Sequence, residues 1–308
     1  MLKFLPNKNS ELQEYIPFSN VDFIVSDIDG TLITGETEVV RQIKTDIRYL
    51  QKQKIYLTVA TGRTYGGALG LLRDLGIRTG MPVALYNGGV VIGFGTENIL
   101  YVNYIGIEIV TEILKKIPLK RVNAYLYTFG KVDYIFQREK TEPFFECVYG
   151  IGPGGRERDT NGTRIIWTER ANIPDSYIVS LLVETKNMTS DEEQQIMTYL
   201  QNNHHIACND SGNGFIEIKA SGQSKGIIFE ILKAERRYNI KKILAIGDNE
   251  NDIELFQHAD IGVAVGNTPA SVMGEADYVC EHDSANGFLD MLNVIRNARR
   301  YSTDRGKG

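Results

Sequence analysis

The chain has 308 residues, of which 42% are hydrophobic and 24% charged, as expected of a folded globular protein with room for two domains. Its net charge of −5 gives no reason to expect a nucleic acid as a partner. No run approaches the ~20 apolar residues of a membrane span, and the N-terminus lacks the apolar core of a signal peptide. Its three cysteines are widely spaced and favour a reducing compartment, so we expect a cytoplasmic protein that binds neither membranes nor nucleic acid.

The first part of the chain predicts a parallel sheet. Residues 1–20 are polar, contain two prolines and form an N-terminal extension. The apolar run 21–25 predicts a buried strand, helical spacing of apolar residues over 38–52 predicts an amphipathic helix, and 55–60 predicts a second buried strand. Another helix and a short strand over 83–86 follow. Strands that alternate with helices imply right-handed crossovers.

The middle of the chain predicts a second domain of different character, with antiparallel strands and a few helices. In chain order we expect strands over 90–94, 99–104, 121–128, 132–136, 177–184 and 214–219, helices over 107–116 and 190–200, and a loop over 150–164.

The alternation of helices and strands returns after Ala220. Its expected elements are strands over 243–246, 261–265 and 278–280, helices over 224–238, 269–275 and 287–296, and a basic, solvated tail from Arg296. We therefore predict an α/β protein with a Rossmann-like parallel-sheet core over residues 21–88 and 220–308. An α+β domain over residues 89–219 is inserted into it.

Two acids follow the first strand. Asp27 and Asp29 are two residues apart, so an extended backbone presents both carboxylates on one side, and Gly30 permits a sharp turn after them. Ligands of open α/β sheets bind at this end of the strands. The pair suits Mg²⁺, which prefers oxygen ligands, or a nucleophilic aspartate of the kind that aspartyl-phosphate enzymes use. A solvated Asx turn is the ordinary alternative.

Further polar clusters occur at other strand ends and helix starts. Thr61-Gly62 offers a hydroxyl and free backbone N–H groups, Lys225 begins a helix, and Gly247–Asp252 contains two more aspartates and Asn251. Each cluster taken separately could be a helix cap or a solvated charge. Their occurrence together at the same edge of a parallel sheet favours a site for phosphate and a metal ion.

The set of motifs resembles the haloacid dehalogenase-like (HAD) superfamily: Asp-x-Asp-Gly-Thr at 27–31, a strand-end Thr61, Lys225 and Gly-Asp-x-x-Asn-Asp at 247–252. The segments 60–63, 87–89, 224–226 and 265–267 are similar to the Cof-type hydrolases, which carry a large class two, subtype B cap. The resemblance extends over about residues 22–292. It implies that the inserted domain is this cap, which selects the substrate.

The resemblance also implies a role for each site residue. Asp27 would be the nucleophile and Asp29 the general acid and base. Mg²⁺ would be held by the Asp27 carboxylate, the Asp29 backbone carbonyl and the Asp248 carboxylate, with Asp252 in support. The residues expected to bind the phosphoryl oxygens of the substrate are Thr61, Gly62, Lys225 and Asn251.

The expected function is that of a Mg²⁺-dependent phosphatase that hydrolyses a small phosphomonoester, with sugar phosphates as the substrates typical of the family. The presence of Asp29 argues against dehalogenation. A sugar phosphomutase and a non-catalytic phospho-ligand-binding protein are the alternatives. The sequence does not predict the oligomeric state. It also assigns no substrate contact in the cap, where ordinary structural roles suffice for the candidates Arg156, Arg158, Arg164, Trp167, His204 and His205.

Overall fold

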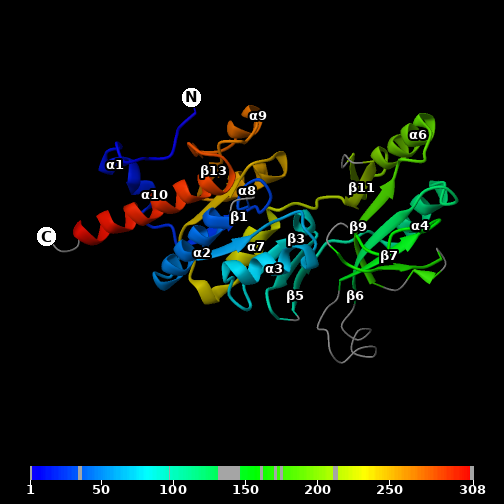
Figure 1. Cartoon of the computed structure of the whole chain (residues 1–308), viewed down its shortest axis with the longest axis horizontal. Coiled ribbons are helices and arrows are strands. Elements are labelled where there is room, and N and C mark those ends of the chain that lie inside the picture. Colours follow the sequence, from blue (N-terminus) through cyan, green and yellow to red (C-terminus); the bar gives the residue numbers. More distant parts are fainter. Residues whose placement is uncertain are drawn as a thin grey trace.

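The computed structural model describes residues 2–33, 37–96, 98–130, 146–159, 162–169, 172–173, 176–210 and 214–305. Two large sheets organise these residues. Figure 1 shows helices α2, α3, α7 and α10 around β1 in one half of the molecule, and β6, β7, β9 and β11 with α4 and α6 in the other half.

The first sheet is parallel throughout, as predicted, with the strand order β14-β13-β12-β1-β2. All four residues of its interior strand β1 are buried, which is typical of a parallel strand covered on both faces. From one edge to the other, the strands are β14 (Tyr278–Val279), β13 (Ile261–Ala264), β12 (Ile243–Gly247), β1 (Phe23–Ser26) and β2 (Tyr56–Val59).

Helices and short 3-10 turns connect and cover these strands. They are α1 (Leu12–Tyr15), η1 (Ile16–Phe18), α2 (Thr37–Lys52), α3 (Tyr65–Leu75), η2 (Tyr86–Gly88), α7 (Ile227–Ala234), η4 (Arg236–Tyr238), η5 (Glu250–Asp252), α8 (Ile253–His258), α9 (Ala270–Met273) and α10 (Ser284–Arg305). The expected solvated tail after Arg296 is wrong, because α10 continues through it. Arg296 forms an ion pair with Asp46 of α2, and Arg299 donates to the Val21 carbonyl at 2.9 Å.

A small antiparallel sheet lies beside β2. The segment predicted as the third parallel strand is β3 (Pro82–Leu85), and only a single parallel bridge, Ala60–Ala84, joins it to the first sheet. It pairs antiparallel with β4 (Val90–Gly93), which in turn pairs with β5 (Ile99–Val102). The buried side chains of β4 belong to the same hydrophobic core as those of β1.

The second large sheet has six strands in the order β10-β11-β9-β6-β7-β8. They are β10 (Ile206–Asp210), β11 (Phe215–Ala220), β9 (Ser176–Glu184), β6 (Ala124–Gly130), β7 (Glu146–Ile151) and β8 (Ile165–Trp167). One face, which includes Leu126, packs on α4 (Ile107–Lys116) and α6 (Ser190–Gln201). The alternate residues, such as Tyr127, belong to the core of the first sheet, so this face is turned toward it.

Three strands of this sheet were not expected from the sequence: β7, β8 and β10. Gly150 lies in β7 rather than at the start of the expected loop, and Phe129 lies in β6 rather than in a hairpin turn. The expected strand over 132–136 lies outside the described residues.

The extents of the two domains stay a prediction. The pairing of β4 and β5 with β3 favours a start of the inserted domain after β5, near residue 103, instead of residue 89, and we propose this later boundary.

The N-terminal extension adds to the first sheet. The Leu5 amide donates to the Val279 carbonyl at 2.9 Å, and the Val279 amide donates to the Lys3 carbonyl at 2.9 Å, so Phe4 forms a parallel bridge with β14. Within the described part of the chain, every helix is too short or too polar to cross a membrane.

Candidate active site

A group of buried charged side chains lies at the carboxyl end of the first sheet. Asp27 directly follows β1, and its amide donates to the Ile246 carbonyl of the neighbouring β12 at 3.0 Å. Lys225, whose side chain is 1% exposed, donates from Nζ to Asp27 Oδ1 at 2.6 Å and to Asp252 Oδ1 at 2.7 Å. A lysine so buried is stable only when paired, so the two carboxylates and the ammonium form one electrostatic unit.

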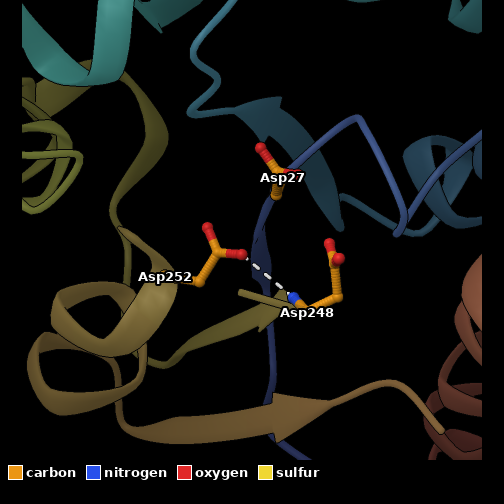
Figure 2. A group of neighbouring side chains, drawn as sticks. All are labelled: Asp27, Asp248 and Asp252. Atoms are coloured by element: carbon orange, nitrogen blue, oxygen red, sulfur yellow. Dashed lines mark hydrogen bonds between the residues drawn. The ribbon is translucent and has the colours of Figure 1, made fainter. Parts of the chain in front are cut away.

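The second strand end brings Asp248 to the same place. It directly follows β12, and Thr31 donates a hydrogen bond to its Oδ1 at 2.7 Å. Asp252 Oδ2 accepts from the amides of Asp248 at 2.9 Å and Asn249 at 3.1 Å, which fixes the turn between them. Figure 2 shows the three aspartates as neighbours, with the hydrogen bond from the Asp248 amide to Asp252.

Burial dominates the electrostatics of this group. It raises the pKa of Asp27 to about 7, with Lys225 opposing the rise and Asp252 adding to it. Burial also raises the pKa of Asp248. For Lys225, burial lowers the pKa, but Asp252 and Asp27 outweigh it and leave the pKa raised, so Lys225 is charged at neutral pH.

The three aspartates fit a divalent cation with oxygen ligands. One carboxylate oxygen from each of Asp27, Asp248 and Asp252 lies within 4.8 Å of the others. Asp252 uses one oxygen for Lys225 and the other for two backbone amides, so Asp27 and Asp248 are the ligands better placed for a metal. Gly30, with φ +81°, makes this packing possible, since a Cβ there would lie 2.3 Å from an Asp248 oxygen.

Asp29 is held away from this group by an arginine that follows the Thr61-Gly62 segment. Arg63 Nε and Nη2 donate to the two oxygens of Asp29 at 2.8 and 2.6 Å. The Asp29 side chain is 60% exposed, and the Arg63 side chain 28% exposed. This bidentate pair orients the Asp29 carboxylate and uses one acceptor position on each of its oxygens, which leaves a second position on each oxygen for a proton.

The expected phosphate-binding residues of the second strand end meet through Asn87. The Asn87 amide donates to the Thr61 carbonyl at 2.9 Å, and the Asn251 side chain donates to Asn87 Oδ1 at 3.0 Å. A Cβ on Gly62 would lie 3.1 Å from the same oxygen. The structure thus brings Thr61, Gly62 and Asn251 together, and their role toward phosphate stays a prediction.

A left-handed turn brings Asn87 to this position. Tyr86, Asn87 and Gly88 have φ of +51°, +52° and +85°, a run that is costly for the two residues with side chains. A Cβ on Gly88 would lie 1.8 Å from the Ser224 carbonyl, so only glycine lets the turn approach the residue before Lys225.

A cavity of about 290 Å³ opens above Asp29, between the first sheet and the inward face of the second. Its floor comes from the segment around Arg63 and from Tyr86, and its roof from three strands of the six-stranded sheet. The lining residues are Asp29, Gly62, Arg63, Thr64, Tyr86, Tyr127, Ser180, Leu182 and Glu217.

One half-buried carboxylate of the second sheet connects the two halves of the molecule beside this cavity. Glu146, the first residue of β7, accepts from the amides of Tyr65 at 2.7 Å and Gly66 at 2.9 Å, at the N-terminus of α3. It also accepts from the Tyr86 hydroxyl. Burial raises its pKa, while these three hydrogen bonds oppose the rise. The positive end of the α3 dipole favours the carboxylate at this position.

The family follows from a comparison with known proteins. The model of the haloacid dehalogenase-like hydrolases matches residues 24–292, which include both strand-end motifs and the six-stranded sheet. The chain belongs to this family.

Relatives of this hydrolase are named phosphatases. The chain is 31% identical to phosphoglycolate phosphatase of Natronomonas pharaonis over 277 residues, which cover 89% of this chain and 97% of that protein. A 34% identical match to phosphoglycolate phosphatase of Methanoculleus marisnigri covers 35% of this chain and only 44% of that protein. These names agree with the predicted phosphoric monoester hydrolase.

A solved structure shares the fold of this chain. The HAD subclass IIB sugar phosphatase BT4131 superposes with a TM-score of 0.62 at 19% identity, over 90% of this chain and 98% of that one. At this identity the likeness concerns the fold alone.

The cap residues that the sequence left unassigned lie outside the cavity lining. In this hydrolase Arg156 lies 3.6 Å from Glu184, and its carbonyl accepts from Trp167 Nε1 at 2.9 Å. His204 and His205 follow the end of α6 and are exposed.

Four residues of the site were missed in the sequence: Arg63, Asn87, Glu146 and Glu217. Arg63 and Asn87 lie in the segments 60–63 and 87–89, whose similarity to the Cof-type hydrolases was the signal that could have identified them. Nothing marks Glu146 or Glu217 before the fold is known.

Proposed function

We propose that this hydrolase is a Mg²⁺-dependent phosphatase that cleaves a small phosphomonoester, with a sugar phosphate as the substrate class, through an aspartyl phosphate on Asp27. The observation that carries the proposal is the buried arrangement of Lys225 between Asp27 and Asp252, with Asp248 alongside, at the ligand-binding edge of the sheet.

The chain's own residues would divide the reaction as follows. An oxygen of Asp27 attacks phosphorus, and Asp29 donates a proton to the leaving oxygen. Asp29 then takes a proton from water as that water attacks the aspartyl phosphate, which releases inorganic phosphate and restores Asp27. Thr61, the Gly62 amide, Lys225 and Asn251 would hold the phosphoryl oxygens during both steps.

Lys225 would serve both the fold and the reaction. It opposes the rise in the pKa of Asp27, and so it favours the ionised nucleophile at a depth where burial favours the neutral acid. Mg²⁺, held by the carboxylates of Asp27 and Asp248 and the Asp29 carbonyl, would neutralise the negative charge that spreads over the phosphoryl group.

The release of phosphate from a panel of phosphomonoesters, with and without Mg²⁺, tests the proposal. We expect turnover that requires Mg²⁺ and falls by about a thousandfold or more in Asp27→Asn. Asp74→Asn is the matched control, because Asp74 lies on α3 with its side chain 74% exposed. Mass spectrometry of the acid-quenched enzyme should find one phosphoryl group on Asp27.

Other results would replace the proposal. Phosphate release that survives Asp27→Asn would exclude Asp27 as the nucleophile. An isomerised sugar phosphate without free phosphate would identify a mutase. Binding of phosphomonoesters without any turnover would identify a phospho-ligand-binding protein.

A further inference from the structure

We propose that Glu217, with the hydroxyl groups of Ser180 and Tyr127, selects the leaving group of the substrate. These residues bind neutral, hydroxyl-bearing leaving groups and reject esters that carry a second anionic group. The proposal rests on the proposed function, because it names the substrate class of the same site.

The roof of the cavity is a continuous patch on one face of the six-stranded sheet. Tyr127 of β6 pairs with Ser180 of β9, and Leu182, two residues further along β9, pairs with Glu217 of β11. Side chains of directly paired residues, and of residues two apart in a strand, lie on the same face. All four line the cavity opposite Asp29 and Gly62, where the leaving group of a phosphomonoester would lie.

The polar groups of this patch suit the recognition of hydroxyl groups. Ser180 Oγ lies 3.5 Å from Glu217 Oε1, a long contact that leaves the carboxylate free to accept hydrogen bonds from a ligand. The Tyr127 hydroxyl is hydrogen-bonded to Asp159, so its oxygen is available as an acceptor. A polyol can donate to all three groups, whereas a carboxylate can donate to none of them.

The cavity lining contains two carboxylates, Asp29 and Glu217, and one cation, Arg63. Two cations of the described residues lie on the same face but outside the lining: Lys219, two residues further along β11, and Arg156, over the Phe215 ring. Neither is ion-paired with Glu217, and Arg156 faces Glu184. Arg63, the cation of the cavity lining, is taken up by both oxygens of Asp29. Asp159 and Glu146 add negative charge near Tyr127. A second anion on the substrate would meet this field in a partly desolvated cavity, where repulsion is stronger than in water.

The consequence is a departure from two relatives. The proteins of Natronomonas pharaonis and Methanoculleus marisnigri are named phosphoglycolate phosphatases, and the leaving group of phosphoglycolate carries a carboxylate. We infer that this hydrolase disfavours phosphoglycolate and other acidic esters.

A matched pair of esters tests the role of Glu217. Sorbitol 6-phosphate and 6-phosphogluconate differ only at C1, which is a hydroxymethyl group in the first and a carboxylate in the second. We expect kcat/KM of the wild type to favour sorbitol 6-phosphate by about tenfold or more. Glu217→Gln should reduce this preference about tenfold, and Glu217→Lys should reverse it. Glu108→Gln is the control, since Glu108 is exposed on α4, which packs on the opposite face of the sheet.

A binding measurement separates this proposal from the proposed function. Calorimetry in an Asp27→Asn background gives the dissociation constants of both esters without turnover. Failure of the wild type to release phosphate would refute the phosphatase, and the ratio of dissociation constants would still decide the role of Glu217. A ratio that is the same with Glu217 and with Glu217→Gln, a wild-type preference for the carboxylate, or no binding of either ester at millimolar concentration would overturn the proposal.

Discussion

Replacement of the nucleophile should make the protein more stable. Asp27 has a side chain that is 7% exposed, and burial raises its pKa from 3.8 to about 7. The folded state therefore holds a proton on Asp27 that the unfolded chain has lost, at every pH between these two values. Since the unfolded state binds fewer protons, stability falls as the pH rises through this range and does not recover above it.

The size of the effect follows from the same two values. A difference of about three pH units at about 1.4 kcal/mol per unit gives about 4 kcal/mol as an upper bound. The value of about 7 already includes the attraction of Lys225, and Asn keeps an oxygen that can accept from Lys225, so we expect Asp27→Asn to gain at most about 4 kcal/mol at pH 8. At pH 4 the gain should vanish, because the wild-type side chain is then neutral in the folded state.

Urea unfolding in the presence of EDTA, at several values between pH 4 and pH 8, measures this difference. The control Asp74→Asn changes an exposed carboxylate and should follow the wild type at each pH. Stability curves of Asp27→Asn and the wild type that run parallel over the whole range would refute the reasoning. Such a result would mean that Lys225 fully compensates the burial of the charge.

Three further substitutions test other contacts. Gly88→Ala should lower the free energy of unfolding by about 3 kcal/mol or more, because the new Cβ would meet the Ser224 carbonyl. Gly70→Ala should raise it by about 0.5–1 kcal/mol, because Gly70 lies in α3 and a Cβ there would have no atom within 4 Å. Thermal and urea unfolding of both variants measure the difference. Asp252→Ala leaves the buried charge of Lys225 with one charged partner and should lower the free energy of unfolding by about 3–5 kcal/mol. An unchanged midpoint of urea unfolding would contradict the electrostatic unit of Asp27, Lys225 and Asp252. Glu146→Gln replaces one of the two oxygens that accept from the Tyr65 and Gly66 amides, so it should lower the free energy of unfolding by about 1–2 kcal/mol. It should also raise KM, because this contact joins the two sheets beside the cavity. Equal KM values of the variant and the wild type would show that the contact does not hold the second sheet over the substrate.

The parallel core could be predicted because its signals are local. A buried run that stops at Asp27, and another that stops at Asp248, place both acids at one sheet edge without any knowledge of the rest. Lys225 was different: nothing in its own segment distinguishes it from a solvated lysine, and the family resemblance alone assigned it. Its burial between two carboxylates is a property of the fold.

The second sheet was harder to predict because partners in it are distant in sequence. The strand β7 reads Glu-Cys-Val-Tyr-Gly-Ile, which has no simple alternation, and it is a strand because β6 lies beside it. The segment Val90–Gly93 was correctly predicted to be a strand, but its pairing with β3 was not predicted, since apolar character does not specify a partner. Glu217 could not be predicted as a site residue, because it lines a cavity that residues from three separate strands form.

The N-terminal residues Lys3–Leu5 cover the edge of the parallel sheet at β14. The outermost strand of the parallel sheet, β14, is two residues long, and its backbone would be open to other chains if Lys3 and Leu5 did not pair with Val279. Recombinant forms trimmed past Leu5 would therefore expose a strand edge and tend to self-associate, even though every catalytic group is intact. An affinity tag is better placed after α10, where no sheet depends on the terminus.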